Sequence, residues 1–199
     1  QDSGGSQSPY EMNINYFDAL SKPNGNESLA LQVSRFIASQ AIMLSLLGVP
    51  GIYFHSLFGS RVWIEGVKQT GRNRTLNRQK LDRAALESAL ADPAALRHKV
   101  FQLYRQLLAA RAASPAFHPH GEQHILYCGE AVFAILRRHG HERVLCLHNV
   151  SAELQRASVD FAALGWRMAA DLIGGEVVNC EAEVVSLAPY QVRWLKPHV

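Results

Sequence analysis

The residues best suited to chemistry lie in a long irregular stretch, residues 56–77, which is rich in Gly, Arg and aromatic residues. Long loops in compact domains are usually functional. Arg74 lies in this stretch and Arg78 follows it directly. A planar guanidinium fork suits two vicinal hydroxyls or an oxyanion better than a lysine would. The stretch is therefore a candidate functional loop, although loop arginines are often only solvated and an Asn-Arg pair often only braces a loop.

The segment before this loop is expected to position it. Gly48-Val49-Pro50-Gly51-Ile52-Tyr53-Phe54-His55 predicts a tight turn and a short buried strand after an almost uncharged helix, residues 27–47. This order is typical of the end of a parallel α/β barrel, in which chemistry sits in the loops at the carboxyl ends of the strands. His55 ends the predicted strand and is a candidate site residue, although a lone histidine at a strand end is more often structural.

The rest of the chain divides into a helical part and a part with short strands. Apolar spacing predicts a short helix over residues 81–90 and a longer one from Pro93 to Ser114. Beyond Glu122, short apolar runs separated by turn residues predict a small antiparallel β domain. The predicted strands are Ile125–Cys128, Ala131–Arg137, Val144–Asn149, Leu154–Val159, Arg167–Leu172, Val184–Leu187 and Gln191–Leu195. We expect one domain over residues 1–117 and a second over residues 118–199.

Composition limits the classes of protein that fit. The chain has 199 residues, 48% of them hydrophobic, and a formal net charge of +3 without clustered basic runs, so nucleic acid is not an expected partner. Polar residues interrupt the apolar helix too often for a membrane span. Cys128, Cys146 and Cys180 fall in apolar strand-like runs, which favours buried free thiols and a cytoplasmic location. The Ser/Gly/Gln-rich start resembles a linker, and the chain reads as the later part of something longer.

The order of these segments resembles the last third of glycoside hydrolase family 13, the α-amylase family, over nearly the whole chain. Two motifs, Tyr10-Glu11-Met12-Asn13 and Arg74-Thr75-Leu76-Asn77-Arg78, resemble the Tyr-Gln-x-Asn and Arg-x-x-Asn-Arg loops of its sucrose phosphorylase branch. The resemblance implies the end of a (β/α)8 TIM barrel, with its eighth strand at Ile52–Phe54, followed by an antiparallel β-sandwich. It further implies that Tyr10, Glu11, Asn13, Arg74, Arg78 and His55 border a substrate site.

The same resemblance implies which groups this chain lacks. Family members carry their nucleophilic Asp, acid/base Glu and supporting Asp on barrel strands four, five and seven, before the part that this chain resembles. The carboxylates near the expected site, Glu11, Asp18 and Glu65, have no motif of a catalytic pair, which in a retaining enzyme lies about 5 Å apart. The chain by itself is therefore expected to be inactive and to need the preceding part of the barrel as a partner.

The resemblance implies a parent enzyme that transfers a glucosyl group between a small α-glucoside and phosphate, without a metal or organic cofactor. Sucrose phosphorylases carry Gln where this chain has Glu11, and an ionised carboxylate donates no hydrogen bond. Branch members that act on glucosylglycerate or similar glucosides carry the Tyr-Glu-x-Asn form, so the resemblance implies a glucosylglycerate-type substrate as a candidate beside sucrose. Arg61, Lys68 and Arg72 would suit an anionic acceptor.

Three other interpretations stay open. A hydrolase or transglucosidase of the same family would share most of these motifs. A non-catalytic carbohydrate-binding or interaction module would display exposed aromatic residues, whereas Trp166 and Trp194 lie in apolar runs and are expected in the core. A metal site at His118, His120 and His124 is not favoured, because no Cys or carboxylate joins them at useful spacing.

An isolated barrel piece would also expose apolar surface, which predicts self-association.

Overall fold

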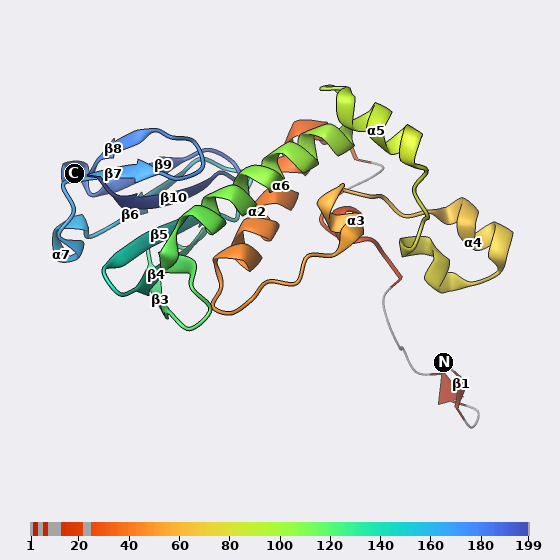
Figure 1. Ribbon diagram of the computed structural model, residues 1–199, viewed down its shortest axis with the longest axis horizontal. Helices are drawn as coiled ribbons and strands as arrows, with labels where there is room; N and C mark the ends of the chain where they lie inside the picture. The colour runs from red at the N-terminus through yellow and green to blue at the C-terminus, as the bar shows by residue number, and fades with distance from the viewer. Residues whose placement is uncertain (1, 4–5, 8–12, 22–24, 199) are drawn as a thin grey trace.

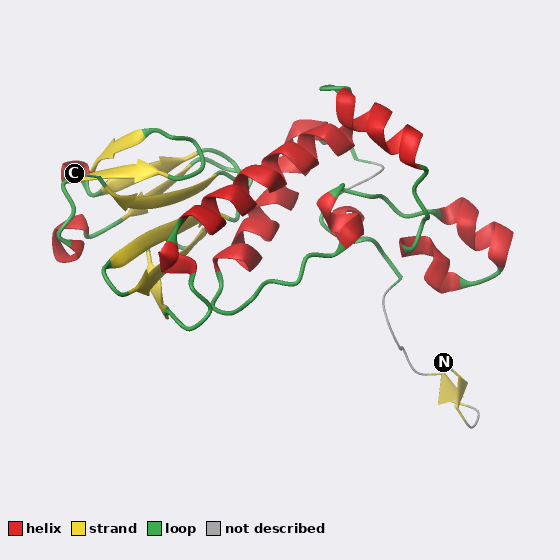
Figure 2. Ribbon diagram, in the orientation of Figure 1, coloured by secondary structure: helices red, strands yellow, loops and turns green. Residues whose placement is uncertain are grey.

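A computed structural model describes residues 2–3, 6–7, 13–21 and 25–198 of the chain. Helices form most of the first 117 residues and strands most of the remainder (Figures 1 and 2). The helices of the first part are α1 (Tyr16–Ala19), α2 (Leu29–Ser45), α3 (Phe54–Leu57), α4 (Ile64–Thr70), the 3-10 helix η1 (Asn73–Asn77), α5 (Arg83–Ala91), α6 (Leu96–Ala113) and the 3-10 helix η2 (Pro115–Phe117). Figure 1 shows α2 and α6 side by side against the sheet, with α4 farther from it.

The second part is antiparallel throughout. Its strands are β3 (Glu122–Tyr127), β4 (Val132–His139), β5 (Glu142–Asn149), β6 (Gln155–Ser158), β7 (Met168–Asp171), β8 (Val177–Asn179), β9 (Val184–Leu187) and β10 (Val192–Pro197). Six of them form one sheet in the order β3-β4-β5-β10-β7-β8, while β6 pairs with β9 in a separate ladder. Two short helices, α7 (Phe161–Leu164) and the 3-10 helix η3 (Cys180–Ala182), connect strands. At the amino terminus, β1 (Asp2–Ser3) pairs with β2 (Ser6–Gln7).

The central strands β4, β5 and β10 have buried residues on both faces of the sheet, because side chains alternate along each strand. One face, which includes Ile135 and Trp194, packs on α2 and α6. The opposite face, which includes Leu145 and Leu195, packs on the β6–β9 ladder through residues such as Leu187. The second part is therefore a β-sandwich whose outer sheet face is covered by two long helices.

Two arginines join the helices to the sandwich. Arg137 of β4 is fully buried and donates from Nη1 to the carbonyls of Ser45 and Leu46, at 2.9 and 2.8 Å, where α2 ends. Arg111 of α6 donates to the carbonyls of Leu44 and Gly48. The last carbonyls of a helix lack intrahelical partners, so these two guanidinium groups satisfy acceptors that would otherwise be buried unpaired.

Many of the sequence expectations for regular structure are confirmed. Both long helices form, and Ser28 caps α2, its side chain accepting from the Leu31 amide at 3.2 Å. The three cysteines are free and buried. Trp166 and Trp194 are core residues, 4% and 0% exposed. The division at residues 117 and 118 stays a prediction, since one apolar core joins the helices to the sheet.

One expected element is wrong. Residues 51–53 are in no strand of the structure, and Phe54 and His55 belong to α3 rather than to a strand. A β-strand is held by hydrogen bonds to a neighbouring strand, and no strand among the described residues lies beside this segment. Its apolar side chains, Ile52, Tyr53 and Phe54, are between 39% and 51% exposed. The loop after it is also more regular than expected, because it contains α4 and η1.

Candidate functional site

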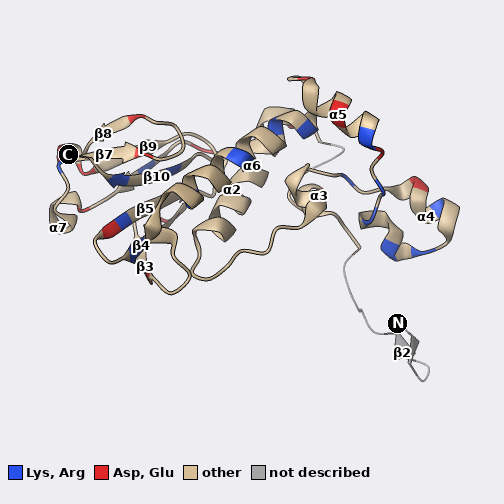
Figure 3. Ribbon diagram, viewed as in Figure 1, with Lys and Arg blue, Asp and Glu red and all other residues tan. Residues whose placement is uncertain are grey.

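The structure brings Arg74 and Arg78 to one hollow. A cavity of about 430 Å³ is lined by Arg72, Asn73, Arg74, Thr75 and Arg78. Figure 3 shows Lys and Arg concentrated in this segment beside α4. None of the five lining residues is Asp or Glu. The hollow therefore offers guanidinium, amide and hydroxyl groups, which suit an anion or a polyol.

Hydrogen bonds from α4 shape this hollow. Thr70 donates its hydroxyl to the Gly66 carbonyl at 2.8 Å and lies 2.9 Å from the hydroxyl of Thr75. The Arg72 amide donates to the same Thr70 oxygen at 3.2 Å. Because the single proton of Thr70 is used by Gly66, Thr75 must donate to Thr70. The hydroxyl oxygen of Thr75 then has only acceptor capacity left for a group in the hollow.

Tyr53 connects the hollow with α3. Its hydroxyl donates to the Asn77 carbonyl at 2.8 Å, and its ring lies edge-on to His55 with centroids 5.4 Å apart. Tyr53 is half-exposed. Tyr53 was not among the predicted site residues, because the sequence predicts a buried strand at this position. An aromatic residue with a polar end next to Gly and Pro turns is the signal that points to an exposed position instead.

His55 occupies a buried position in α3, and the sequence prediction that it follows a strand is wrong. Its Nδ1 lies 3.1 Å from Ser60 Oγ, which accepts from Arg97 Nη1 at 3.0 Å. Burial, and then the positive charge of Arg97, lower the pKa of His55. A neutral imidazole can accept the Ser60 proton at Nδ1, so His55, Ser60 and Arg97 form a hydrogen-bonded chain. His55 does not line the arginine hollow.

The first motif lies only partly within the described residues. Tyr10 and Glu11 fall outside them, and Asn13 is exposed. Just after it, Asp18 is almost fully buried and forms an ion pair with Arg61, with 2.7 Å between Oδ1 and Nη1. Arg61 also donates from Nη2 to Gln32 Oε1 at 2.8 Å. Arg61, predicted as a cation for an anionic acceptor, is thus engaged in holding α1 and α2 together.

Lys68 has a local partner as well. It lies 3.7 Å from Glu65 on the same exposed helix face, and such pairs contribute little. Glu65, one of the carboxylates considered for catalysis, is therefore a surface residue of α4. Of the three extra basic residues proposed for an anionic acceptor, Arg72 is the one that lines the hollow.

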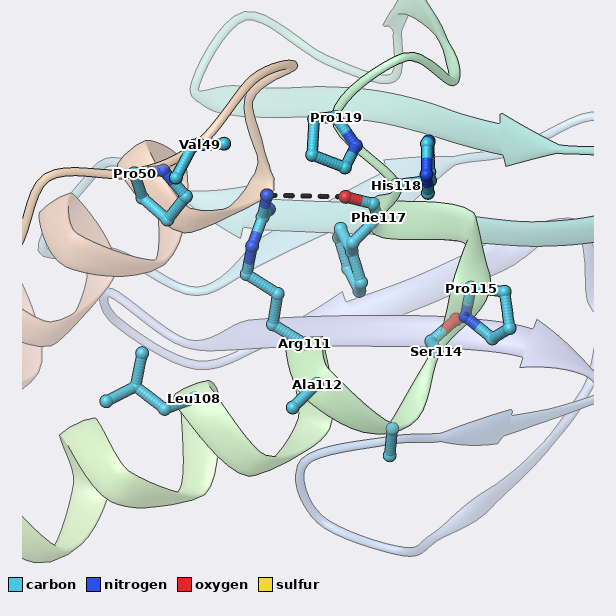
Figure 4. Close-up of a pocket in the computed structure, with 11 residues that line it drawn as sticks. Val49, Pro50, Leu108, Arg111, Ala112, Ser114, Pro115, Phe117, His118 and Pro119 are labelled. Carbon is cyan, nitrogen blue, oxygen red and sulfur yellow. Dashed lines mark hydrogen bonds between the residues drawn. The ribbon is translucent and has the colours of Figure 1, made fainter.

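A second hollow, of about 550 Å³, lies where the helices meet the sandwich (Figure 4). Val49, Pro50 and Leu108 contribute apolar wall, and Arg111 reaches across to the Phe117 carbonyl at 3.3 Å. Arg111 also donates to two carbonyls near the end of α2, so its hydrogen bonds join the helices to the sandwich. This hollow belongs to the packing of the two parts.

Near the sandwich, the His118 ring stacks on that of His139 with centroids 4.2 Å apart and lies 5.7 Å from that of His120. His124 lies 3.4 Å from Glu122. Across the described ranges, no group of three or more His, Cys, Asp or Glu is arranged to hold a metal ion. In the same part of the chain, no helix combines the length and apolar character needed to cross a membrane.

Comparison with known proteins gives the class. The Maltogenic Amylase, C-terminal domain family matches residues 124–194, within the sandwich. Among solved structures, AmyP in complex with maltotriose superposes with a TM-score of 0.71 at 16% identity, over 92% of this chain and 37% of that protein. The α-amylase of Geobacillus thermoleovorans with acarbose gives a TM-score of 0.66 at 15% identity, over 84% of this chain and 34% of the other. The fold is that of the end of an α-amylase barrel and the β-sandwich after it.

The chain belongs to glycoside hydrolase family 13, in its sucrose phosphorylase-like branch, as a carboxy-terminal region. It is similar to the glucosylglycerate phosphorylases of Spirochaeta thermophila, 44% identical over 96% of this chain and 34% of the relative, and of Allomeiothermus silvanus, 41% identical over 94% and 31%. The glucosylglycerate phosphorylase of Escherichia coli K12 is 34% identical over 96% of this chain and 33% of its own length. The chain thus spans about a third of the length of these curated relatives.

Proposed function

We propose that this chain is the carboxy-terminal part of a retaining sugar phosphorylase that acts on a small α-glucoside of the glucosylglycerate type. The observation that carries the proposal is the similarity of nearly the whole chain, at 34–44% identity, to three glucosylglycerate phosphorylases. The hollow lined by Arg72, Arg74 and Arg78 supports it, because both phosphate and glycerate are anions that bind guanidinium groups.

The proposed reaction has two steps. An enzyme carboxylate displaces glycerate from glucosylglycerate and forms a glucosyl ester, and a second carboxyl group protonates the leaving oxygen. A phosphate oxygen then attacks the anomeric carbon of this ester and gives its proton to the second carboxylate, which breaks the bond between the sugar and the first carboxylate and releases glucose 1-phosphate. Neither carboxylate is among the residues that line the hollow. We therefore propose that the chain is inactive alone, that the preceding part of the barrel supplies both groups, and that the protein works in the cytoplasm without a cofactor.

Within this proposal, Arg74 and Arg78 bind the substrate at the hollow, together with Tyr10, Glu11 and Asn13 of the first motif. A glutamate at position 11 accepts hydrogen bonds from the hydroxyl groups of an acceptor but donates none when ionised, which favours glucosylglycerate over sucrose. The hydrogen-bonded chain of His55, Ser60 and Arg97 lies outside the lining of the hollow, so His55 supports the site without contacting the sugar.

A chimeric enzyme tests the proposal. The preceding part of the Spirochaeta thermophila enzyme is joined to this chain and supplied with glucosylglycerate and phosphate. We expect glucose 1-phosphate from the chimera and none from the 199-residue chain. Release of free glucose alone would indicate a hydrolase, and faster turnover of sucrose than of glucosylglycerate would refute the proposed substrate.

The arginine hollow is tested in the same chimera. Arg74→Lys keeps the charge but loses the two-pronged donor, and we expect kcat/KM to fall about tenfold to a hundredfold, as for the loss of a hydrogen bond to a charged group. Arg83→Lys is the matched control, because Arg83 is an exposed residue of α5 paired with Glu87 at 2.8 Å. Equal activities of the two variants would remove Arg74 from the site.

A further inference from the structure

Asp18 and the Arg61–Trp63 segment connect the two sequence motifs. Asp18 lies in α1, five residues after Asn13, and Arg61 lies just before α4. The Asp18 carboxylate receives the Arg61 guanidinium at 2.7 Å on Oδ1 and the Val62 amide at 2.6 Å on Oδ2. Asn15 adds a third link, donating from Nδ2 to the Arg61 carbonyl at 2.6 Å. Residues more than 40 positions apart are thus joined by three hydrogen bonds.

The next amide continues this connection to the arginine hollow. The Trp63 amide donates to the Leu76 carbonyl at 2.8 Å, and Leu76 lies in η1 between Arg74 and Arg78. Two consecutive amides, those of Val62 and Trp63, therefore bind α1, which follows the first motif, on one side and η1 on the other. One peptide unit thus separates the Asp18 contact from the contact with the backbone that carries the arginines.

The environment of the pair makes this connection rigid. The Asp18 side chain is 4% exposed, and the Arg61 guanidinium also contacts Gln32 of α2 and lies 4.9 Å from the Phe17 ring centroid. A buried carboxylate that loses its cation leaves an uncompensated charge, which is strongly unfavourable. The carboxylate thus has one stable arrangement, in which both of its oxygens are occupied.

We propose that Asp18 is a positioning residue: its carboxylate sets the placement of η1, and with it the Arg74 and Arg78 side chains, relative to the Asn13 loop. The functional half of this inference rests on the proposed phosphorylase activity. Asp18 acts through Val62 and Trp63. Its role is to fix the distance between the Asn13 loop and the arginines of the hollow, which together bind an anionic substrate. Its substitution raises KM for that substrate while the chemical step keeps most of its rate.

The first test measures amide hydrogen exchange in the 199-residue chain. Asp18→Asn keeps the shape but removes the charge and replaces one acceptor oxygen with a donor, which faces either the Arg61 guanidinium or the Val62 amide. We expect exchange over residues 62–78 to accelerate at least tenfold, while exchange in β5 stays unchanged. Glu65→Gln is the matched control, since this exposed carboxylate lies on the adjoining α4, and it should leave both regions unchanged. Unchanged exchange over residues 62–78 in Asp18→Asn overturns the proposal.

Faster exchange in β5 of Asp18→Asn would reveal a general loss of folding. A second pair of variants tests the proposal in that case. Arg61→Ala removes the partner cation, and Arg61→Lys retains a cation that can reach Asp18. Exchange over residues 62–78 should accelerate in Arg61→Ala and recover at least partly in Arg61→Lys. Equal acceleration in both variants contradicts an electrostatic positioning role.

The kinetic test uses the chimeric enzyme defined above. We expect Asp18→Asn to raise KM for phosphate about tenfold with less than a threefold change in kcat. A fall in kcat alone overturns the positioning role. Absence of phosphorolysis in the unsubstituted chimera overturns the proposed function instead, and the exchange measurements then decide whether Asp18 positions η1.

Discussion

Arg137 donates to the carbonyl of Ser45 over 2.9 Å, although the two residues are 92 positions apart in the chain. The guanidinium is fully buried and has no carboxylate partner among the described contacts. Its donors reach four carbonyls instead, those of Glu122, Ser45, Leu46 and His118. The positive charge also favours the carboxyl end of α2, where the helix dipole is negative. Arg137 is therefore the group that joins the sandwich to the end of this helix.

Replacement of Arg137 tests this junction. Arg137→Ala leaves several buried carbonyls without donors, and we expect the free energy of unfolding to fall by about 3–5 kcal/mol. Arg138→Ala is the control, because the neighbouring side chain is exposed, and it should change stability by less than about 0.5 kcal/mol. Urea denaturation measures both values. Similar losses of unfolding free energy in the two variants would show that the buried hydrogen bonds of Arg137 do not stabilise the fold more than an exposed arginine does.

The pH dependence of stability is set in part by His148. Its Nδ1 lies 2.9 Å from the Phe133 carbonyl, and its Nε2 accepts from Trp194 Nε1 at 3.4 Å. Burial lowers the pKa of His148 from 6.5 to about 4. The folded state thus binds fewer protons than the unfolded state, so this contribution is complete above pH 6.5 and is lost as pH falls toward 4.

A shift of this size corresponds to roughly 3 kcal/mol, since each pKa unit is about 1.4 kcal/mol. His148→Asn retains a donor for the Phe133 carbonyl but does not titrate. Denaturation curves between pH 7 and pH 4 should show wild type losing more stability than this variant. Burial raises the pKa of the nearby Asp171, which acts in the opposite direction but cancels when the two proteins are compared. Parallel pH profiles would contradict the role of His148.

The contact between Gly66 and Trp63 provides a test of the α4–η1 unit. A Cβ on Gly66 would lie 2.1 Å from Trp63 Cε3. Helix propensity alone would stabilise Gly66→Ala by about 1 kcal/mol, whereas forcing an atom into a packed site costs about 1–3 kcal/mol. We expect the steric cost to prevail and Trp63 to move outward.

Tryptophan fluorescence measures this movement, because Trp63 is partly exposed whereas Trp166 and Trp194 are buried. Gly66→Ala should shift the emission to longer wavelength and lower the melting temperature. Glu65→Ala at the neighbouring exposed position controls for helix propensity. A rise in stability of Gly66→Ala without an emission shift would mean that the ring accommodates the added methyl group.

Tyr104 and Gln40 form a buried hydrogen bond between α6 and α2. The Tyr104 hydroxyl donates to Gln40 Oε1 at 3.0 Å, and both side chains are almost fully buried. Tyr104→Phe leaves the Gln40 oxygen unpaired, with an expected cost of about 1–3 kcal/mol. Combining it with Gln40→Met removes both polar groups, and we expect this double variant to lose less than the sum of the single variants. Additive losses in a double-mutant cycle would show that the two groups do not interact.

The sequence alone determined the regular elements whose apolar residues repeat with a local period. The helical spacing of apolar residues predicted the helix over residues 27–47, which contains α2, and short apolar runs separated by turn residues predicted the antiparallel β domain that contains Cys146 and Trp194. Its two motifs also led to the family that the comparisons confirm. These signals depend on neighbours in the chain, so they can be recognised without knowing the fold.

Only the tertiary structure decided which polar groups meet. Arg61 was expected at an anionic substrate but pairs with Asp18, and Arg137 gave no sign in the sequence of its contacts with the end of α2. The expected strand at Ile52–Phe54 is absent for the same reason, since a strand needs hydrogen-bonding neighbours. An apolar run or a charged residue indicates which kind of group a side chain can contact. Its actual partner depends on segments that are distant in the chain and are brought together by folding.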